Sequence, residues 1–191
     1  MPTRSDWLQV GLAAVVDDGP DGLRIYRLCR RLSVSKGSFH DHFSGAADFK
    51  RSLLAAYEDL VVRALYQAID QTEAETPQAA LAGLTAAITS TPGIYRPELE
   101  VAIRAWAFSD AEVRTVQERV DRQRLQSLIG IWSKIIDDPA QAHTAALLPY
   151  LVAIGASLVQ PPTPSDQLQR IYELLMGLVP DKSNEKGPST S

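Results

Sequence analysis

The clearest hydrophobic pattern in the chain lies between residues 24 and 43, where it predicts two short helices joined by a tight turn. In the second helix Phe39 and Phe43 stand one turn apart, so both can pack against the first helix. The first helix carries four apolar residues at i, i+3, i+4 and i+7, which share one face that must be buried: Ile25, Leu28, Cys29 and Leu32. Arginines occupy the outer side of this first helix.

The turn at Ser33 and Val34 leads into the second helix, and its residues predict how that helix starts. The hydroxyl of Ser35 can accept hydrogen bonds from the first free amides, while Val34 pairs with Phe39 across the start. Gly37 allows the backbone to approach a phosphate closely. The open side of this helix is expected to carry five residues: Lys36, Gly37, Ser38, His40 and His42. A short, well-anchored helix with a polar outer face is suited to enter a groove.

Helical spacing of apolar residues recurs along the rest of the chain, so an all-α fold is predicted. A first helix, capped by Ser5, is expected to run to about Asp18 with Leu8, Leu12, Val15 and Val16 inside, and Gly19-Pro20 ends it. Later helices are expected over about 46–72, from Pro77 to Pro92, from Pro97 to about 109, over about 111–136 with Asp110 as cap, from Pro139, and over 165–179.

Composition and charge refine this picture. The 191 residues include 45% hydrophobic side chains, enough for a small head and a larger core. The net charge is −4, but residues 24–51 hold seven basic and two acidic side chains, so they carry +5 and the remainder −9. Local charge governs attraction to phosphates, although a solvated basic surface is the alternative. Cys29 cannot form an internal disulfide, and no secretory signal is recognised, which favours the cytoplasm.

The segment 139–165 contains no formally charged residue. Its apolar part, 144–160, is shorter than the ~20 residues of a membrane span and is interrupted by Pro149 and Gly155, so no membrane helix is expected. A helix that is apolar on most sides is better explained by burial against both its own core and a second subunit. Together with the last helix it would form a dimer interface of Leu151, Ile154, Gly155, Leu158, Leu168, Ile171, Tyr172 and Leu175.

No catalytic constellation is recognised, so an enzyme is not expected, and no cofactor is implied. His40 and His42 are i and i+2 on a helix and point apart, which disfavours a metal site. An inward-facing Arg104 would need an anionic partner or exposure. Candidate residues for a small-molecule cavity are Tyr66, Arg104, Trp106, Trp132, His143 and Tyr150, whose simpler interpretation is ordinary core packing or, for Arg104, a surface position.

The run from Leu28 to Phe43, with its Val-Ser-Lys-Gly-Ser-aromatic segment followed by His-Phe, resembles the DNA-binding domain of the TetR family of transcriptional regulators. The segment 102–110 resembles the start of the ligand-binding domain in part of that family. Arg24, Ser33, His40 and Ala46 depart from the family pattern, which often has Thr, Gly, Tyr and a basic residue at these places. One expected phosphate contact is therefore in question, and Arg24 or Lys50 could replace its charge.

The resemblance implies a three-helix helix-turn-helix head over residues 1–46, a helical ligand-binding and dimerisation core over 47–180, and a disordered tail over 181–191. It implies a homodimeric regulator, most simply a repressor, that binds a pseudo-palindromic operator in double-stranded DNA and responds to an unidentified small molecule. Expected DNA contacts are Arg24, Ser35, Lys36, Gly37, Ser38, His40, His42 and Lys50, with Asp41 near the bases. The alternative is a helical binding or scaffold module with a degenerate head.

Overall fold

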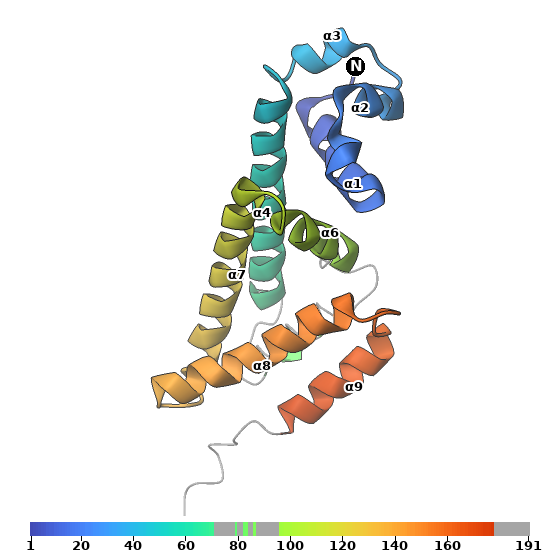
Figure 1. Cartoon of the computed structure of the whole chain (residues 1–191). Helices are drawn as coiled ribbons and strands as arrows, with labels where there is room; N and C mark the ends of the chain where they lie inside the picture. Colours follow the sequence, from blue (N-terminus) through green and yellow to red (C-terminus); the bar gives the residue numbers. More distant parts are fainter. Residues whose placement is uncertain (71–78, 80–81, 84–85, 87–95, 178–191) are drawn as a thin grey trace, which may run out of the picture. The chain divides into compact units, whose positions relative to one another are not determined.

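A computed structural model describes residues 1–70, 79, 82, 83, 86 and 96–177 of the chain, and the regular structure within these ranges is entirely helical (Figure 1). The all-α prediction is therefore confirmed. The helix expected from Pro77 to Pro92 and the tail 181–191 fall largely or wholly outside the described residues. The elements are α1 (Arg4–Asp18), η1 (Gly19–Leu23), α2 (Ile25–Leu32), α3 (Lys36–His40), α4 (Ala46–Asp70), α6 (Pro97–Ala107), α7 (Ala111–Trp132), α8 (Pro139–Leu158) and α9 (Ser165–Met176).

The start of α1 differs from the sequence prediction. Thr3, not Ser5, is the N-cap residue: its hydroxyl accepts a hydrogen bond from the Asp6 amide at 3.2 Å, and the Asp6 carboxylate accepts one from the Thr3 amide at 2.7 Å. This reciprocal pair is a capping box. Leu12 and Val15 of the expected inner stripe are buried, but the expectation for Val16 is wrong, because it is 39% exposed. Trp7, Gly11 and Ala14, which were not predicted, are buried as well.

The predicted cap at Asp110 and the predicted start of a helix at Pro139 are confirmed. The Asp110 carboxylate accepts hydrogen bonds from the Glu112 and Val113 amides at 3.1 and 3.3 Å, so α7 begins directly after it. Asp138 accepts from the Ala140 amide at 3.0 Å, and Pro139 takes the first helical position of α8, where its missing amide proton costs nothing. The helix α7 ends at Trp132 and is shorter than predicted.

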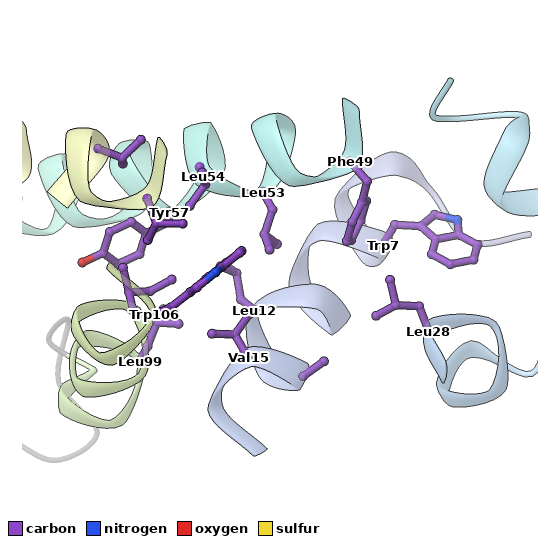
Figure 2. Close-up of a cluster of buried hydrophobic side chains, with 14 of the residues drawn as sticks. Trp7, Leu12, Val15, Leu28, Phe49, Leu53, Leu54, Tyr57, Leu99 and Trp106 are labelled. Atoms are coloured by element: carbon purple, nitrogen blue, oxygen red, sulfur yellow. The ribbon is translucent and has the colours of Figure 1, made fainter. Parts of the chain in front are cut away.

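The chain divides into two compact units, and the first comprises Met1–Arg63 and Arg96–Arg122. The head boundary expected at residue 46 lies inside it. Its core packs α1, α2 and α3 with the first part of α4, and continues to α6 and the start of α7. Figure 2 shows Trp7, Leu28 and Phe49 at one end of this core, and Tyr57 of α4 beside Leu99 and Trp106 of α6 at the other.

Two glycines allow the close packing of the first unit. A Cβ at Gly11 of α1 would come within 2.8 Å of both Leu53 Cδ1 and Phe49 Cζ, so α1 reaches α4 at this position. A Cβ at Gly22 would come within 2.6 Å of the backbone oxygen of Ala14. A side chain at Gly11 would displace Leu53 and Phe49, whereas one at Gly22 would meet the Ala14 backbone, so the glycines let α1 pack closely on α4 and η1 on α1.

The second unit comprises Ala64–Tyr95 and Gln123–Ser191. Among its described residues, a second apolar cluster joins the end of α7 to the start of α8 through Ile131, Trp132, Ile135, Ala142 and Ala146. The consecutive helices α8 and α9 pack against each other (Figure 1). The Tyr172 hydroxyl of α9 donates a hydrogen bond to the Pro149 carbonyl of α8 at 2.9 Å. Pro149 lies inside α8.

Candidate nucleic-acid interface

The helix α3 is supported from beneath by aromatic rings. Phe39 is fully buried, and its ring centroid lies 5.4 Å from that of Trp7, 5.3 Å from Phe43 and 5.5 Å from Phe49. Edge-to-face and tilted pairs at these separations add stabilisation beyond the burial of area. The predicted role of Phe39 and Phe43 as anchors is confirmed, and α3 is held on α1 and α4 as well as on α2.

The turn between α2 and α3 has a left-handed residue. Ser33 has φ 56° and ψ 42°, a conformation that favours glycine, and this explains why a glycine is common here in the resembling family. Ser35 occupies the N-cap position in extended conformation, but its hydroxyl makes no capping hydrogen bond, contrary to the prediction. The turn is closed instead by the Val34 amide, which donates to the Cys29 carbonyl at 3.0 Å.

The open side of α3 is only partly as predicted. Lys36, Gly37 and His40 are exposed. The expectation that Ser38 is open is wrong, because this residue is only 6% exposed. His42 is half-buried, and its Nε2 lies 3.0 Å from the Pro2 carbonyl oxygen. The exposed surface of α3 is therefore narrower than expected, with one lysine, one histidine and a bare backbone at the glycine.

Much of the positive charge of the head is matched by acidic residues at the end of α1 and in η1. The Arg31 guanidinium lies 2.7 Å from Asp17 and 2.8 Å from Asp18, and these hydrogen bonds raise its pKa. Arg24 pairs with Asp21 at 2.8 Å, and Arg27 lies 3.9 Å from Asp18. These carboxylates lie outside residues 24–51, so the +5 of that segment overstates the charge offered to a polyanion.

Lys50 is also engaged within the protein. Its Nζ lies 2.7 and 2.8 Å from the Asp110 carboxylate oxygens, 2.9 Å from Glu112 and 5.6 Å from the Trp106 ring centroid. The hydrogen bond from Lys50 lowers the pKa of Asp110 despite partial burial, which acts the other way. The expectation that Lys50 replaces a missing phosphate contact is therefore not supported, because Lys50 joins α4 to the cap of α7.

Two exposed side chains of α2 were missing from the predicted contacts. Tyr26 is 50% exposed, and its hydroxyl accepts a hydrogen bond from Arg27 Nε at 3.2 Å, which lowers its pKa. Arg30 stands one turn later on the same side and is exposed, with no ion pair to it among the described residues. Tyr26 and Arg30 are spaced i, i+4, which places them on one side of α2. This spacing could have predicted a shared contact surface, but only the arginines were predicted to lie on the outer side.

The six candidate cavity residues do not gather in one compact unit. Arg104 and Trp106 belong to the first unit, where the Arg104 guanidinium forms a bidentate pair with Asp121 at 2.7 and 2.8 Å. The anionic partner that an inward arginine requires is thus supplied by the protein. The second unit holds Tyr66, which is 55% exposed, the exposed His143, the half-buried Tyr150 and the 8% exposed Trp132.

The Arg104 pair belongs to a polar network inside the first unit. The fully buried Tyr57 donates to Gln117 Oε1 at 2.9 Å, and Gln117 Nε2 donates to Asp121 at 2.6 Å. Glu100 lies one turn before Arg104 and is 4% exposed. Gln117 and Asp121 were not singled out from the sequence, because the residues that join them to the network, Tyr57 and Arg104, are on other helices.

The expected dimer residues fall into three groups by exposure. Leu151 and Leu158 are 59% and 48% exposed. Leu168 and Tyr172 are 8% and 3% exposed within their own chain, so the expectation that they are open to a partner is wrong. The others are half-buried: Ile154, Gly155, Ile171 and Leu175. Leu148 and Leu174, which were not predicted as interface residues, are 48% and 74% exposed on α8 and α9.

Within the part of the chain that the structure describes, no three His, Cys, Asp or Glu side chains gather in a way that could hold a metal ion. Nor does any helix of the described ranges have the length and apolar character needed to cross a bilayer.

We compared the chain with known protein families, sequences and structures. No protein-family model and no curated protein sequence matches the chain. Solved structures do match: a TetR-family transcriptional regulator from Streptomyces coelicolor has a TM-score of 0.75 at 16% identity, over 93% of this chain and 96% of that one. A transcriptional regulator from Rhodococcus sp. Rha1 has a TM-score of 0.74 at 16% identity, over 93% and 96%. A regulator from Saccharomonospora viridis in complex with choline has a TM-score of 0.75 at 15% identity, over 92% and 95%. The chain therefore has the fold of the TetR-family transcriptional regulators.

Proposed function

We propose that this protein is a cytoplasmic transcriptional regulator that binds double-stranded DNA as a homodimer, most simply as a repressor. The observation that carries the proposal is the surface of α3, where Lys36, Gly37 and His40 are exposed on a helix whose opposite side is fixed by buried aromatic rings. A helix held in this way can enter a major groove without rearrangement, and the fold is that of known regulators.

Each exposed group has a chemical role in the proposed complex. The Lys36 ammonium would bind a backbone phosphate, as would Arg30, and the Tyr26 hydroxyl would donate to a phosphate oxygen. Gly37 lets the backbone approach the sugar-phosphate chain closely, since the nearest atom to a Cβ built there is Ser35 Oγ at 3.5 Å. His40 is the exposed side chain of α3 best suited to a base edge, since it can donate or accept a hydrogen bond.

Dimerisation would use the exposed leucines of the second unit. Leu148, Leu151 and Leu158 of α8 and Leu174 of α9 are each about half exposed or more, and several exposed apolar side chains on one pair of helices are what a subunit interface would cover. Two copies that cover these residues around a two-fold axis would present two α3 helices, about 34 Å apart, to successive major grooves. The operator would then be a pseudo-palindrome. The head would bind DNA, and the core would dimerise and bind the small molecule.

The proposed response to a small molecule rests on the second unit. The indole Nε1 of Trp132 is buried and has no hydrogen-bond acceptor among the described residues, and a bound acceptor would recover the free energy that this costs. A structural neighbour from Saccharomonospora viridis holds choline. An effector bound here would alter DNA binding only if it binds one conformation of the dimer better than the other.

One observation favours the alternative of a scaffold module with a degenerate head. Five of the seven basic side chains in residues 24–51 have a carboxylate within 4 Å, since Arg51 also lies 3.9 Å from Asp48. Such pairing weakens the attraction to any polyanion. A scaffold of this kind would bind genomic DNA without selecting a sequence, or would not bind it.

Selection of genomic fragments with the purified full chain distinguishes the two functions. A regulator should enrich fragments that share a pseudo-palindromic motif, and a Lys36→Ala/His40→Ala variant should lose the enrichment while it keeps its helical content. The matched control is Lys134→Ala, which removes an exposed lysine from the second unit. Enrichment of no motif by the wild-type protein would overturn the proposal in favour of the scaffold.

A further inference from the structure

The helix α3 is too short to hold its own position. It spans five residues, Lys36–His40, and lacks a side-chain cap at its start. An isolated helix of this length is unstable in water, so its conformation depends on contacts with other elements. The aromatic rings fix its underside. The turn that follows it, Asp41 to Phe43, needs separate support because carbonyl groups at the end of a helix lack partners within the helix.

Arg4 supplies that support from the beginning of α1. Its Nη1 donates a hydrogen bond to the His42 carbonyl at 2.6 Å, and its Nη2 donates to Ser52 Oγ at 2.6 Å. The guanidinium carbon lies 4.5 Å from the centroid of the Phe43 ring. Ser52 Oγ itself donates to the Asp48 carbonyl at 2.9 Å, so it accepts from Arg4 with a lone pair. One side chain therefore joins α1, the end of α3 and the first turns of α4.

The segment that presents Arg4 is itself fixed. Thr3 and Asp6 form the capping box, and the hydrogen bonds from Thr3 lower the pKa of Asp6. Pro2, next in the same segment, adds a second contact, because its carbonyl oxygen lies 3.0 Å from His42 Nε2. His42 is thus held through both its backbone carbonyl and its ring by residues at the start of the chain.

The Arg4 contacts require the geometry of a guanidinium. Its two terminal nitrogens reach different acceptors at once while its plane covers an aromatic ring, and a lysine ammonium cannot do all three. We infer that Arg4 is a positioning residue for DNA recognition, which holds the end of α3 at a fixed angle on α4 and does not itself bind the operator. This inference rests on the proposed function, since α3 is the helix that would read DNA.

The first test compares two variants at Arg4 on the motif enriched from genomic DNA and on an unrelated duplex. Arg4→Ala and Arg4→Lys should both reduce the preference for the motif on the order of tenfold, the effect of losing a charge-assisted hydrogen bond. Affinity for the unrelated duplex and its salt dependence should stay unchanged. The control is Arg63→Ala, because Arg63 forms an exposed pair with Asp59 one turn earlier.

Two results of this test would overturn the inference. If Arg4→Lys restores full binding while Arg4→Ala weakens both duplexes alike, Arg4 is a phosphate contact. If neither variant changes the preference for the motif, Arg4 does not position α3.

A second test does not depend on DNA. The amides of Asp41, His42 and Phe43 donate to carbonyls of α3 at 3.0 to 3.1 Å, so their hydrogen exchange reports opening of this turn. Both Arg4 variants should speed exchange at these three amides by roughly tenfold, with little change in the interior of α4. Unchanged exchange would overturn the inference even if DNA binding is confirmed. If the wild-type protein selects no motif, the proposed function fails, and the exchange rates still decide the role of Arg4.

Discussion

The salt dependence of the proposed DNA binding should be shallow, and Lys36 should account for about half of it. Each phosphate neutralised by a lysine or arginine contributes about −0.9 to the slope of log K against log salt concentration. Among the seven basic side chains of residues 24–51, only Lys36 and Arg30 have no carboxylate partner among the described residues. A dimer would then make about four such contacts, and the slope would be about −4.

This value differs clearly from the one that composition alone suggests. If all seven side chains of each head reached phosphates, the slope would be about −13, and binding would nearly vanish over a fourfold increase in salt. With four contacts, the same increase should weaken binding roughly 150-fold. Lys36→Ala removes one contact from each subunit and should bring the slope to about −2.

Fluorescence anisotropy of a labelled operator duplex, titrated at several KCl concentrations, measures both slopes. Lys134→Ala is the matched control, since Lys134 is an exposed lysine of the second unit and its loss should leave the slope unchanged. A wild-type slope of about −8 or steeper would show that the paired arginines leave their carboxylates for phosphates. An unchanged slope in Lys36→Ala would remove this residue from the interface.

Three further changes test the packing and assembly. Asp110→Asn should lower the free energy of unfolding at neutral pH by about 1 kcal/mol, between the values for exposed and buried pairs. Because the folded-state pKa of Asp110 lies below its ordinary 3.8, the wild-type advantage should persist above that pH and disappear below it, as chemical denaturation at a series of pH values would show. Gly22→Ala should cost about 1 to 3 kcal/mol in thermal unfolding, because its Cβ meets the Ala14 backbone oxygen; an unchanged melting temperature would contradict the packing. Gly155→Glu should give monomers on size exclusion while Gly155→Ala stays dimeric, since a Cβ there meets no atom of the described residues within 4 Å; a dimeric Glu variant would place the interface elsewhere.

Local patterns predicted the supports of the head well. The buried positions of Leu28, Cys29, Phe39 and Phe43 follow from spacing alone. Apolar residues three or four positions apart lie on one face of a helix, and that face is the one expected to be buried. The caps at Asp110 and Asp138 were equally predictable, since a helix start requires acceptors within its first turn. In each case the groups that determine the outcome lie within a few residues of each other.

The sequence was a poor guide to which polar side chains remain exposed. Lys50 pairs with Asp110, sixty positions later, and Arg31 with Asp17, fourteen positions earlier, so these ion pairs depend on the packing of separate helices. Ser38 was misassigned because α3 has too few residues to establish a periodic face. Val16 was misassigned because two small residues share the buried side of α1: Gly11 packs against α4, and Ala14 packs against Gly22 of η1.

The polar network inside the first unit limits how its helices can move relative to each other. Tyr57 of α4, Gln117 of α7 and Arg104 of α6 are joined through hydrogen bonds of 2.6 to 2.9 Å that converge on Asp121. Apolar packing tolerates small sliding motions, but a network of buried hydrogen bonds loses its partners when one member shifts. A change in the angle of α4 must therefore either carry α6 and α7 with it or break this network. Since Lys50 joins the same α4 to the cap of α7 nearer the head, the first route preserves both sets of contacts and requires less free energy.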